Sequence, residues 1–319
     1  MAGITESSRV FSSPCRSHAS LASMLRTLMM LQVTGGALMG WAVLSLTHPD
    51  ATVGLRATGA VALGVLTPAL AVICGSLICA VWAGLRPWSL THWRVLINET
   101  ALALRLFLWR QPWSGAPTPR LDGPEDGPPV LLVHGYFCNH RIWDELTHDL
   151  VAAGYRVARI DLEPVFASID DYVPLIDNAV RVLRAQNATR AIALVGHSMG
   201  GLALRAWLRQ HGNARVACLL TLGTPHAGTR LAHLTQTHNG RQMKHGSAWL
   251  QQLHADETPA TQALVHVALS AHDTIVFPQT VQTLPQASLT RLDGLGHLQL
   301  CQHPRVRSWV LDRLSTCLK

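Results

Sequence analysis

The chain has 319 residues, of which 48% are hydrophobic and 14% are charged, and its formal net charge is +7. Soluble globular chains carry about a quarter charged residues, so this chain has a deficit of charged residues, and the deficit is concentrated in the first third. The positive charge forms no basic cluster, so we expect no nucleic-acid partner and only weak attraction to an anionic membrane surface. The seven cysteines include no C-x-x-C pair and no zinc spacing, so we expect no metal site and no cofactor.

The N-terminal region predicts a tail followed by two membrane helices. Residues 1–24 are rich in serine and lack hydrophobic periodicity, which predicts a disordered tail. Uncharged runs at 27–47 and 57–85 are each long enough to cross a bilayer, which requires about 20 residues. We therefore predict two transmembrane helices within 25–86. A buried helical pair packed on a soluble domain is the alternative.

Arginines flank the two apolar runs on their outer sides, whereas the loop between the runs holds only Arg56, offset by Asp50. The flanking residues are Arg9, Arg16, Arg26, Arg86, Arg94, Arg105 and Arg110. The positive-inside rule then places both termini in the cytoplasm. We predict a multi-pass protein of the inner or plasma membrane whose large C-terminal domain lies on the cytoplasmic side.

Residues 87–128 connect the membrane segment to the rest of the chain. Residues 88–113 interleave tryptophan and leucine with arginine and glutamate. This pattern predicts an amphipathic helix that either lies at the membrane interface or packs on the following domain. The prolines and glycines at 111–129 then indicate a semi-rigid linker that ends at a domain boundary.

From 129 to 319, short apolar runs alternate with helical patterns. The runs are 129–134, 156–162, 190–195, 216–222, 264–270 and 288–292. Such alternation predicts an α/β domain with a mostly parallel sheet and helices on both faces.

The third run leads into Gly196-His197-Ser198-Met199-Gly200, and a helical pattern follows. A G-x-S-x-G motif between a buried strand and a helix is typical of a nucleophile elbow, whose sharp turn lifts the serine hydroxyl above the sheet. The helix N-terminus also favours negative charge at this place. We therefore predict that Ser198 is a nucleophile, rather than part of a chance match in a glycine-rich chain.

A serine nucleophile needs a base that takes its proton and an acid that orients the base. Asp273 follows the fifth run and is the predicted acid, because Asp256 lies in a polar helical stretch and Asp293 is too close to the predicted base. His297 follows the last run in a glycine-flanked loop, and we predict that it is the base among 17 histidines. The order Ser198, Asp273, His297 is the one expected for this elbow.

When a serine attacks a carbonyl group, two backbone N–H groups are needed to bind the oxyanion that forms. Met199, directly after the nucleophile, is predicted to supply one of them. Tyr136, in the loop after the first run, is predicted to supply the other. The neighbouring His134 is interpreted as a structural residue that holds this loop by hydrogen bonds.

These residues resemble the α/β-hydrolase superfamily, and within it the bacterial triacylglycerol lipases and esterases. The resemblance runs from 130 to the C-terminus and rests on Ser198, Asp273, His297, His134-Gly135-Tyr136 and Leu222-Gly223-Thr224-Pro225-His226-Ala227-Gly228-Thr229. It implies an α/β-hydrolase fold over 129–319 and a cap or lid at 226–262. The apolar N-terminal segment departs from the secreted lipases, and no calcium-ligand pattern is present.

The sequence thus predicts a membrane-anchored serine hydrolase that cleaves carboxylic esters through an acyl-enzyme intermediate. Its predicted partners are an ester or lipid-like small molecule and the lipid bilayer. An acyltransferase or thioesterase with the same triad remains open, as does a non-catalytic membrane-anchored binding module.

Overall fold

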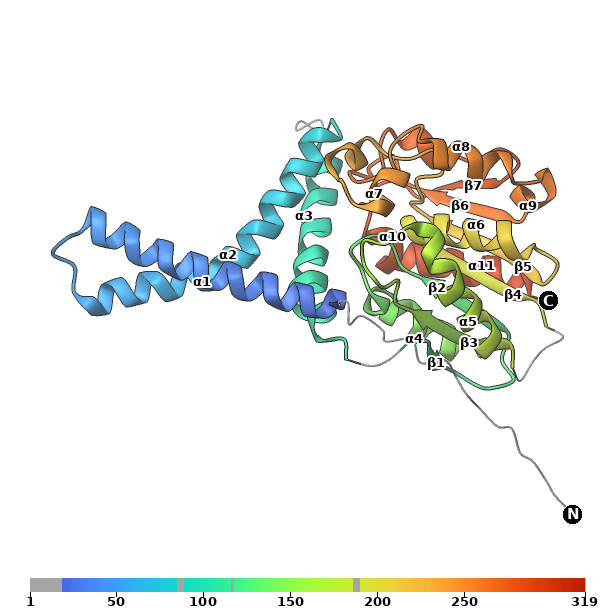
Figure 1. Ribbon diagram of the computed structural model, residues 1–319, viewed down its shortest axis with the longest axis horizontal. Helices are drawn as coiled ribbons and strands as arrows, with labels where there is room; N and C mark the ends of the chain where they lie inside the picture. The colour runs from blue at the N-terminus through green and yellow to red at the C-terminus, as the bar shows by residue number, and fades with distance from the viewer. Residues whose placement is uncertain (1–18, 85–88, 116–117, 186–189, 319) are drawn as a thin grey trace, which may run out of the picture.

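The computed structural model describes residues 19–84, 89–115, 118–185 and 190–318. A long helical hairpin projects from an α/β domain, and a third helix lies across the base of the hairpin (Figure 1). Most of the tail predicted over 1–24 lies outside the described residues, as do residues 85–86 of the predicted membrane segment. The first helix already begins at Leu21, where the Ser20 side chain accepts the N–H of Ser23 as an N-cap.

Seven strands of the described chain form one sheet in the order β1-β3-β2-β4-β5-β6-β7. They are β1 (Arg120–Asp122), β2 (Pro129–Val133), β3 (Arg156–Ile160), β4 (Ile192–His197), β5 (Val216–Leu222), β6 (Val265–Leu269) and β7 (Ser288–Arg291). β1 pairs antiparallel with β3, and the other neighbouring pairs are parallel. The predicted mostly parallel sheet is confirmed, and each predicted apolar run overlaps one of these strands.

The first strand lies within the stretch that the sequence pattern assigned to a linker. In β1, Leu121 stands opposite Ala158, and the Arg159 guanidinium binds Asp122 at 2.7 Å and Asp144 at 2.9 Å. A three-residue edge strand is too short to show the alternation by which strands are recognised. The sheet therefore begins before the predicted boundary at 129.

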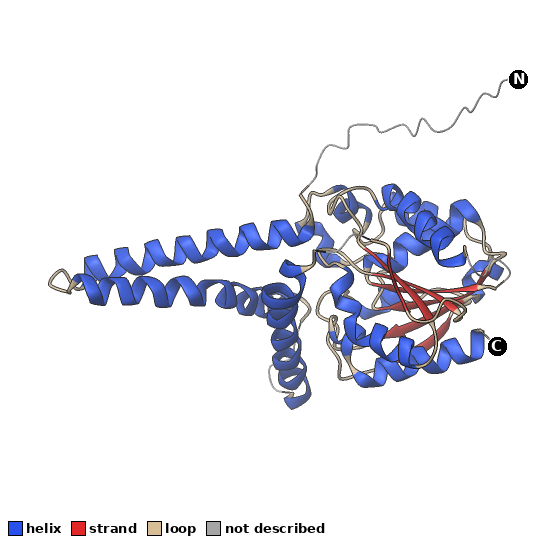
Figure 2. Ribbon diagram, turned by 90° about the horizontal axis from the view of Figure 1, so that it is seen from below, coloured by secondary structure: helices blue, strands red, loops and turns tan. Residues whose placement is uncertain are grey.

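Helices cover both faces of the sheet (Figure 2). One face carries α5 (Val173–Arg184), α6 (Met199–His211) and α8 (Ala248–Ala255), and the other carries α4 (Asp144–Ala152) and α11 (Pro304–Cys317). The shorter helices are α7 (His238–Gln242), α9 (Pro259–Ala263) and α10 (Gln299–Gln302). In β2, Leu131 and Val133 face the first group, whereas Val130 and Leu132 face the second. A strand buried on both faces is apolar at every position, which is why this one appears in the sequence as an unbroken apolar run.

The predicted membrane pair consists of α1 (Leu21–Thr47) and α2 (Val53–Trp82), which pack side by side as a hairpin. Both helices are long and apolar enough to cross a membrane, and only 11% of the most apolar window of each is buried. Helices in the core of a soluble domain are mostly covered, so the alternative of a buried pair does not describe this hairpin.

Helix α3 (Leu90–Leu104) lies between the hairpin and the α/β domain, and short turns at Arg105–Arg110 and Gln111–Trp113 follow it. Its buried side carries Val95, Leu96, Glu99 and Ala103. Its outer side exposes Leu90, Trp93 and Ile97, with Leu90 88% exposed. One side of the helix thus packs inward, while the other is an exposed apolar stripe of the kind found at membrane interfaces.

Candidate active site

Ser198 sits in the sharp turn between β4 and α6, at the carboxyl end of the parallel sheet. Its φ of 53° and ψ of −125° lie in a region that non-glycine residues rarely adopt, and this strain is characteristic of a nucleophile elbow. Its N–H donates to Leu222 O at 2.9 Å. A Cβ at Gly200 would lie 2.2 Å from Val133 O, and one at Gly196 would lie 2.6 Å from Gly201 N. These positions therefore accept only glycine.

Asp273 and His297 meet beside this turn although they lie in different loops. His297 Nδ1 donates to Asp273 Oδ2 at 2.8 Å, and both side chains are buried. The other carboxylate oxygen, Oδ1, accepts the N–H groups of Ile275 and Val276 at 2.8 and 2.9 Å. Gln282 Nε2 also donates to Oδ2 at 3.3 Å. The carboxylate is therefore fixed in one orientation, with its second oxygen toward the imidazole.

The two rejected acids lie in other surroundings. Asp293 accepts the N–H of Ala271 at 2.8 Å. Asp256 accepts the Gln252 amide at the end of α8. Neither carboxylate is paired with His297, and only Asp273 has the position that the predicted triad requires.

The Asp273 contact leaves Nε2 of His297 available for a proton from Ser198. Burial by itself lowers the pKa of His297, but the charge and hydrogen bond of Asp273, together with the charge of Glu99, outweigh it, so the pKa is raised above its ordinary value. Ser198 and His297 line the same cavity. In the described part of the chain no hydrogen bond joins them, and in ligand-free enzymes this contact often tightens only when substrate binds.

His197, inside the elbow motif, supports the loop of the predicted base. Its Nε2 donates to the carbonyl oxygen of His297 at 3.1 Å, and the two rings lie 4.5 Å apart between centroids. Burial holds the pKa of His197 well below its ordinary value, so this ring is neutral. Because the His297 carbonyl oxygen occupies its Nε2, we interpret His197 as a support for the His297 loop rather than a second base.

The predicted oxyanion donors flank Ser198. A Cβ on Gly135 would lie 2.7 Å from Ser198 Cβ, so the loop that carries Tyr136 passes directly against the nucleophile. His134 holds this loop, because its Nδ1 donates to Gly135 O at 2.9 Å while its Nε2 accepts the N–H of Leu162 at 3.0 Å. Among the described residues, neither the Tyr136 nor the Met199 N–H group has a hydrogen-bond acceptor. Both donors are free to bind an oxyanion.

Glu99 of α3 is a member of this site that the sequence pattern did not reveal. Its Oε1 accepts the N–H of Leu298 at 2.5 Å and its Oε2 accepts that of Gln299 at 3.1 Å. A Cβ on Gly296 would lie 2.4 Å from Glu99 Oε2. Burial raises the pKa of Glu99 to about 7, against the lowering effect of the two N–H groups and of His297. The buried Glu99 carboxylate therefore holds the loop that carries His297, through Gly296 before this residue and through Leu298 and Gln299 after it.

We expect Glu99→Gln to lower kcat/KM about tenfold, because a glutamine offers one acceptor oxygen to two buried N–H groups. The variant also lacks the negative charge that Glu99 carries above its pKa of about 7 and that raises the pKa of His297. Since the base works when neutral, the acid limb of the pH–rate profile should move to lower pH. The measurement is kcat/KM for p-nitrophenyl butyrate as a function of pH, with the full chain in detergent.

Glu145→Gln is the matched control, because Glu145 is a partly exposed carboxylate that pairs with Arg105 and Arg110 on the surface. We expect it to leave the profile in place. A lower rate in Glu99→Gln with an unmoved acid limb would show that Glu99 contributes only to structure and not to the state of His297.

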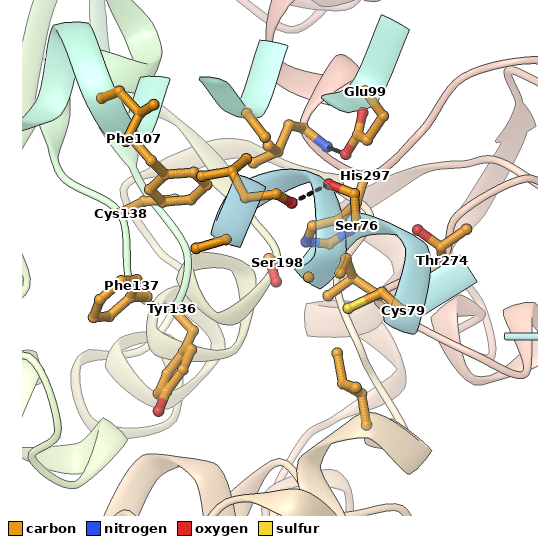
Figure 3. A pocket seen from close by; sticks show the side chains of 18 of the residues that line it. Ser76, Cys79, Glu99, Phe107, Tyr136, Phe137, Cys138, Ser198, Thr274 and His297 are labelled. Atoms are coloured by element: carbon orange, nitrogen blue, oxygen red, sulfur yellow. Dashed lines mark hydrogen bonds between the residues drawn. The ribbon is translucent and has the colours of Figure 1, made fainter. Parts of the chain in front are cut away.

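Ser198 and His297 border an apolar cavity of about 430 Å³ between α1, α2, α3 and the α/β domain (Figure 3). Of the segment 226–262, predicted as a cap, Leu231 lines the cavity within the described chain. The same segment packs Leu250 and Leu253 into the core beside α6, and Trp249 donates to Asp170. The N-terminal helices therefore cover the site where the resemblance implied a cap.

In the described residues, no group of three or more His, Cys, Asp and Glu side chains could hold a metal ion. The site offers the side chains and backbone N–H groups named above. These are the groups needed to attack a carbonyl, hold the resulting oxyanion and move one proton.

Comparison with known proteins agrees with this geometry. The model of the alpha/beta hydrolase family matches residues 130–312. The chain belongs to this family. A triacylglycerol lipase of Pseudarthrobacter phenanthrenivorans is 33% identical over 34% of this chain and 36% of the lipase. A GPI inositol-deacylase of Candida albicans is 30% identical over 32% of each chain. The matched part of this chain thus spans about a third of the length of these relatives.

Among solved structures, the mature lipase BlEst2 of Bacillus licheniformis is similar to this chain with a TM-score of 0.53 and 18% identity, and the match covers 64% of this chain and 100% of the lipase. At this identity the likeness shows the fold alone. The predicted resemblance to the α/β-hydrolase superfamily is confirmed, and a lipase is among the distant homologues.

Proposed function

We propose that the chain is a membrane-anchored serine hydrolase that cleaves carboxylic esters. The observation that carries this proposal is the buried 2.8 Å contact between His297 Nδ1 and Asp273 Oδ2 beside a serine in the strained elbow conformation. The same two loops meet Ser198 on one cavity wall. This is the arrangement that converts a weakly nucleophilic hydroxyl into a reactive one.

The proposed reaction has two halves. Ser198 Oγ attacks the ester carbonyl carbon while His297 Nε2 takes the hydroxyl proton, and the Tyr136 and Met199 N–H groups bind the oxyanion. The bond to the alcohol then breaks, the alcohol leaves with the proton from His297, and the acyl group stays on Ser198. In the second half, water gives a proton to His297 and attacks the acyl carbon. Ser198 recovers that proton as the carboxylic acid departs.

The test is hydrolysis of p-nitrophenyl butyrate by the full chain in detergent, followed during titration with a fluorophosphonate. We expect activity to fall in proportion to the labelled fraction. Activity that survives complete labelling would contradict a serine mechanism, and a folded chain that neither turns over esters nor takes the label would favour a binding role.

We further propose that the hairpin spans the membrane and that the α/β domain lies on the cytoplasmic side. The support is the exposed apolar surface of α1 and α2 and the arginines on the outer sides of both apolar runs. Alkaline phosphatase, which is active only outside the cytoplasm, should be active when fused after Asp50 and inactive when fused to the C-terminus. The reverse pattern would contradict the orientation, and inactivity of both fusions would contradict spanning.

A further inference from the structure

We propose that the two hairpin helices form the wall of an acyl-chain site, and that the substrate is a long-chain carboxylic ester that enters from the lipid bilayer. This proposal rests on the ester hydrolysis proposed above. It adds the substrate class and assigns the determinant of chain length to residues outside the α/β domain.

The cavity at the nucleophile is shared between the two parts of the molecule. Its wall on the hairpin side includes Leu25, Leu28 and Met29 of α1 and Val72, Gly75 and Cys79 of α2. Its opposite wall includes Ser198 and His297. Figure 3 shows Ser76 and Cys79 of α2 among the residues that line the cavity together with Ser198 and His297. An acyl group bound to Ser198 would therefore have membrane-helix side chains around its hydrocarbon chain.

The shape of the hairpin explains why a cavity forms here. In the outer halves of the helices, a Cβ at Gly40 would lie 2.6 Å from Gly59 O, and one at Gly36 would lie 2.1 Å from Thr67 Oγ1, so the helices are in close contact. Pro68 follows within α2. Proline lacks the N–H for the helical hydrogen bond and bends a helix, and the second half of α2 turns away from α1 (Figure 1). The cavity-lining residues, at 25–32 and 71–79, belong to the halves that diverge.

The lining chemistry suits a hydrocarbon chain with a polar group only at one end. Among the hairpin residues described on the wall, Gln32 and Ser76 are the ones with polar side chains, and Ser76 Oγ already donates to Val72 O at 3.0 Å. Glu99 is occupied by the N–H groups of the His297 loop. Apart from Gln32 and Thr274, the polar groups available to an ester carbonyl among the described lining residues are gathered at Ser198 and His297. A volume of about 430 Å³ is within the usual range for small-molecule sites, about 300–1,000 Å³.

The outer surface of the same helices favours the bilayer as the source of the substrate. Next to the lining residues, Met30, Leu31 and Ile78 are 71%, 66% and 55% exposed. Apolar side chains at this exposure are stable in lipid and costly in water. Because one helix wall faces lipid outside and the cavity inside, an acyl chain reaches Ser198 from the bilayer without crossing a polar surface.

Gly75 offers a direct test of the acyl wall. It lines the cavity, and a Cβ built on it meets no atom within 4 Å. A leucine at this position therefore extends into open space and shortens the room for an acyl chain. Gly35 of α1 is the matched control, because a Cβ there also meets no atom within 4 Å, it is exposed and it does not line the cavity.

The experiment compares kcat/KM for p-nitrophenyl palmitate and p-nitrophenyl acetate in wild type, Gly75→Leu and Gly35→Leu, each as the full chain in mixed detergent–phospholipid micelles. We expect the palmitate-to-acetate ratio to fall at least about tenfold in Gly75→Leu, since shape in an apolar pocket discriminates chain lengths by that order. The ratio in Gly35→Leu should equal that of wild type. Because both esters report on the same folded fraction, a loss of folded protein does not change the ratio.

An unchanged ratio in Gly75→Leu, with wild type active on esters, would overturn the acyl-wall proposal and leave the proposed ester hydrolysis standing. An equal change in Gly35→Leu would also overturn it, because the effect would then come from altered helices rather than from the cavity. Absence of turnover with every ester in folded wild type would overturn the proposed function and this proposal with it.

Discussion

Replacement of Ser198 by alanine should abolish covalent labelling by a fluorophosphonate and lower kcat for ester hydrolysis about 10⁴–10⁶-fold. The Ser198 hydroxyl is the group that we propose forms the acyl-enzyme, whereas His297 and the oxyanion donors remain in the variant and leave a small residual rate. Alanine removes one atom from a buried side chain, so the fold should persist. The measurements are gel fluorescence of the labelled membrane fraction and single-turnover hydrolysis of a p-nitrophenyl ester.

Ser45→Ala is the control, because Ser45 is a hairpin serine whose hydroxyl donates to Trp41 O within its own helix. It should label and turn over like wild type. Label retained in Ser198→Ala would show that another residue is the nucleophile. Loss of label without loss of turnover would show that the probe and the substrate react at different groups.

The part of the site that could be predicted from sequence is the part encoded locally. The elbow is a contiguous motif whose glycines are required because a Cβ added to Gly200 would lie 2.2 Å from a backbone oxygen. The motif can therefore be found in the sequence alone. Asp273 and His297 follow from chain order, since parallel strands carry their functional loops to the same edge of the sheet. The parallel strands, buried on both faces, appear as unbroken apolar runs for the same reason.

The residues that escaped prediction act across long separations in the chain. Glu99 contacts a loop 199 residues away, and nothing in its own helix distinguishes it from the acid expected on a solvated face. The part of the cavity wall formed by α1, α2 and α3 depends on how the hairpin packs on the α/β domain. Sequence periodicity does not encode that packing. The cap that the resemblance implies at 226–262 stays a prediction, and the family match at 130–312 does not extend to α1, α2 and α3.

Replacement of Asp273 by asparagine should lower kcat about 10³–10⁴-fold while leaving the fold intact. The orientation of the new amide is determined by its neighbours. Its oxygen must stay toward the N–H groups of Ile275 and Val276, which Oδ1 now accepts at 2.8 and 2.9 Å. Its NH₂ group therefore faces His297 Nδ1, where Oδ2 now accepts a hydrogen bond. A donor at that place favours the tautomer with its proton on Nε2, and such an imidazole cannot take the proton of Ser198.

The variant should also change the pH dependence of the residual activity, because the carboxylate is the main group that raises the pKa of His297 against the effect of burial. Without the charge, that pKa falls, and the acid limb of kcat/KM moves to lower pH. Asp293→Asn is the matched control, since Asp293 is a nearby carboxylate that accepts the N–H of Ala271 and pairs with Arg291. It should keep both rate and profile. A rate in Asp273→Asn within about tenfold of wild type would mean that the buried pair supports the loop and does not orient the base.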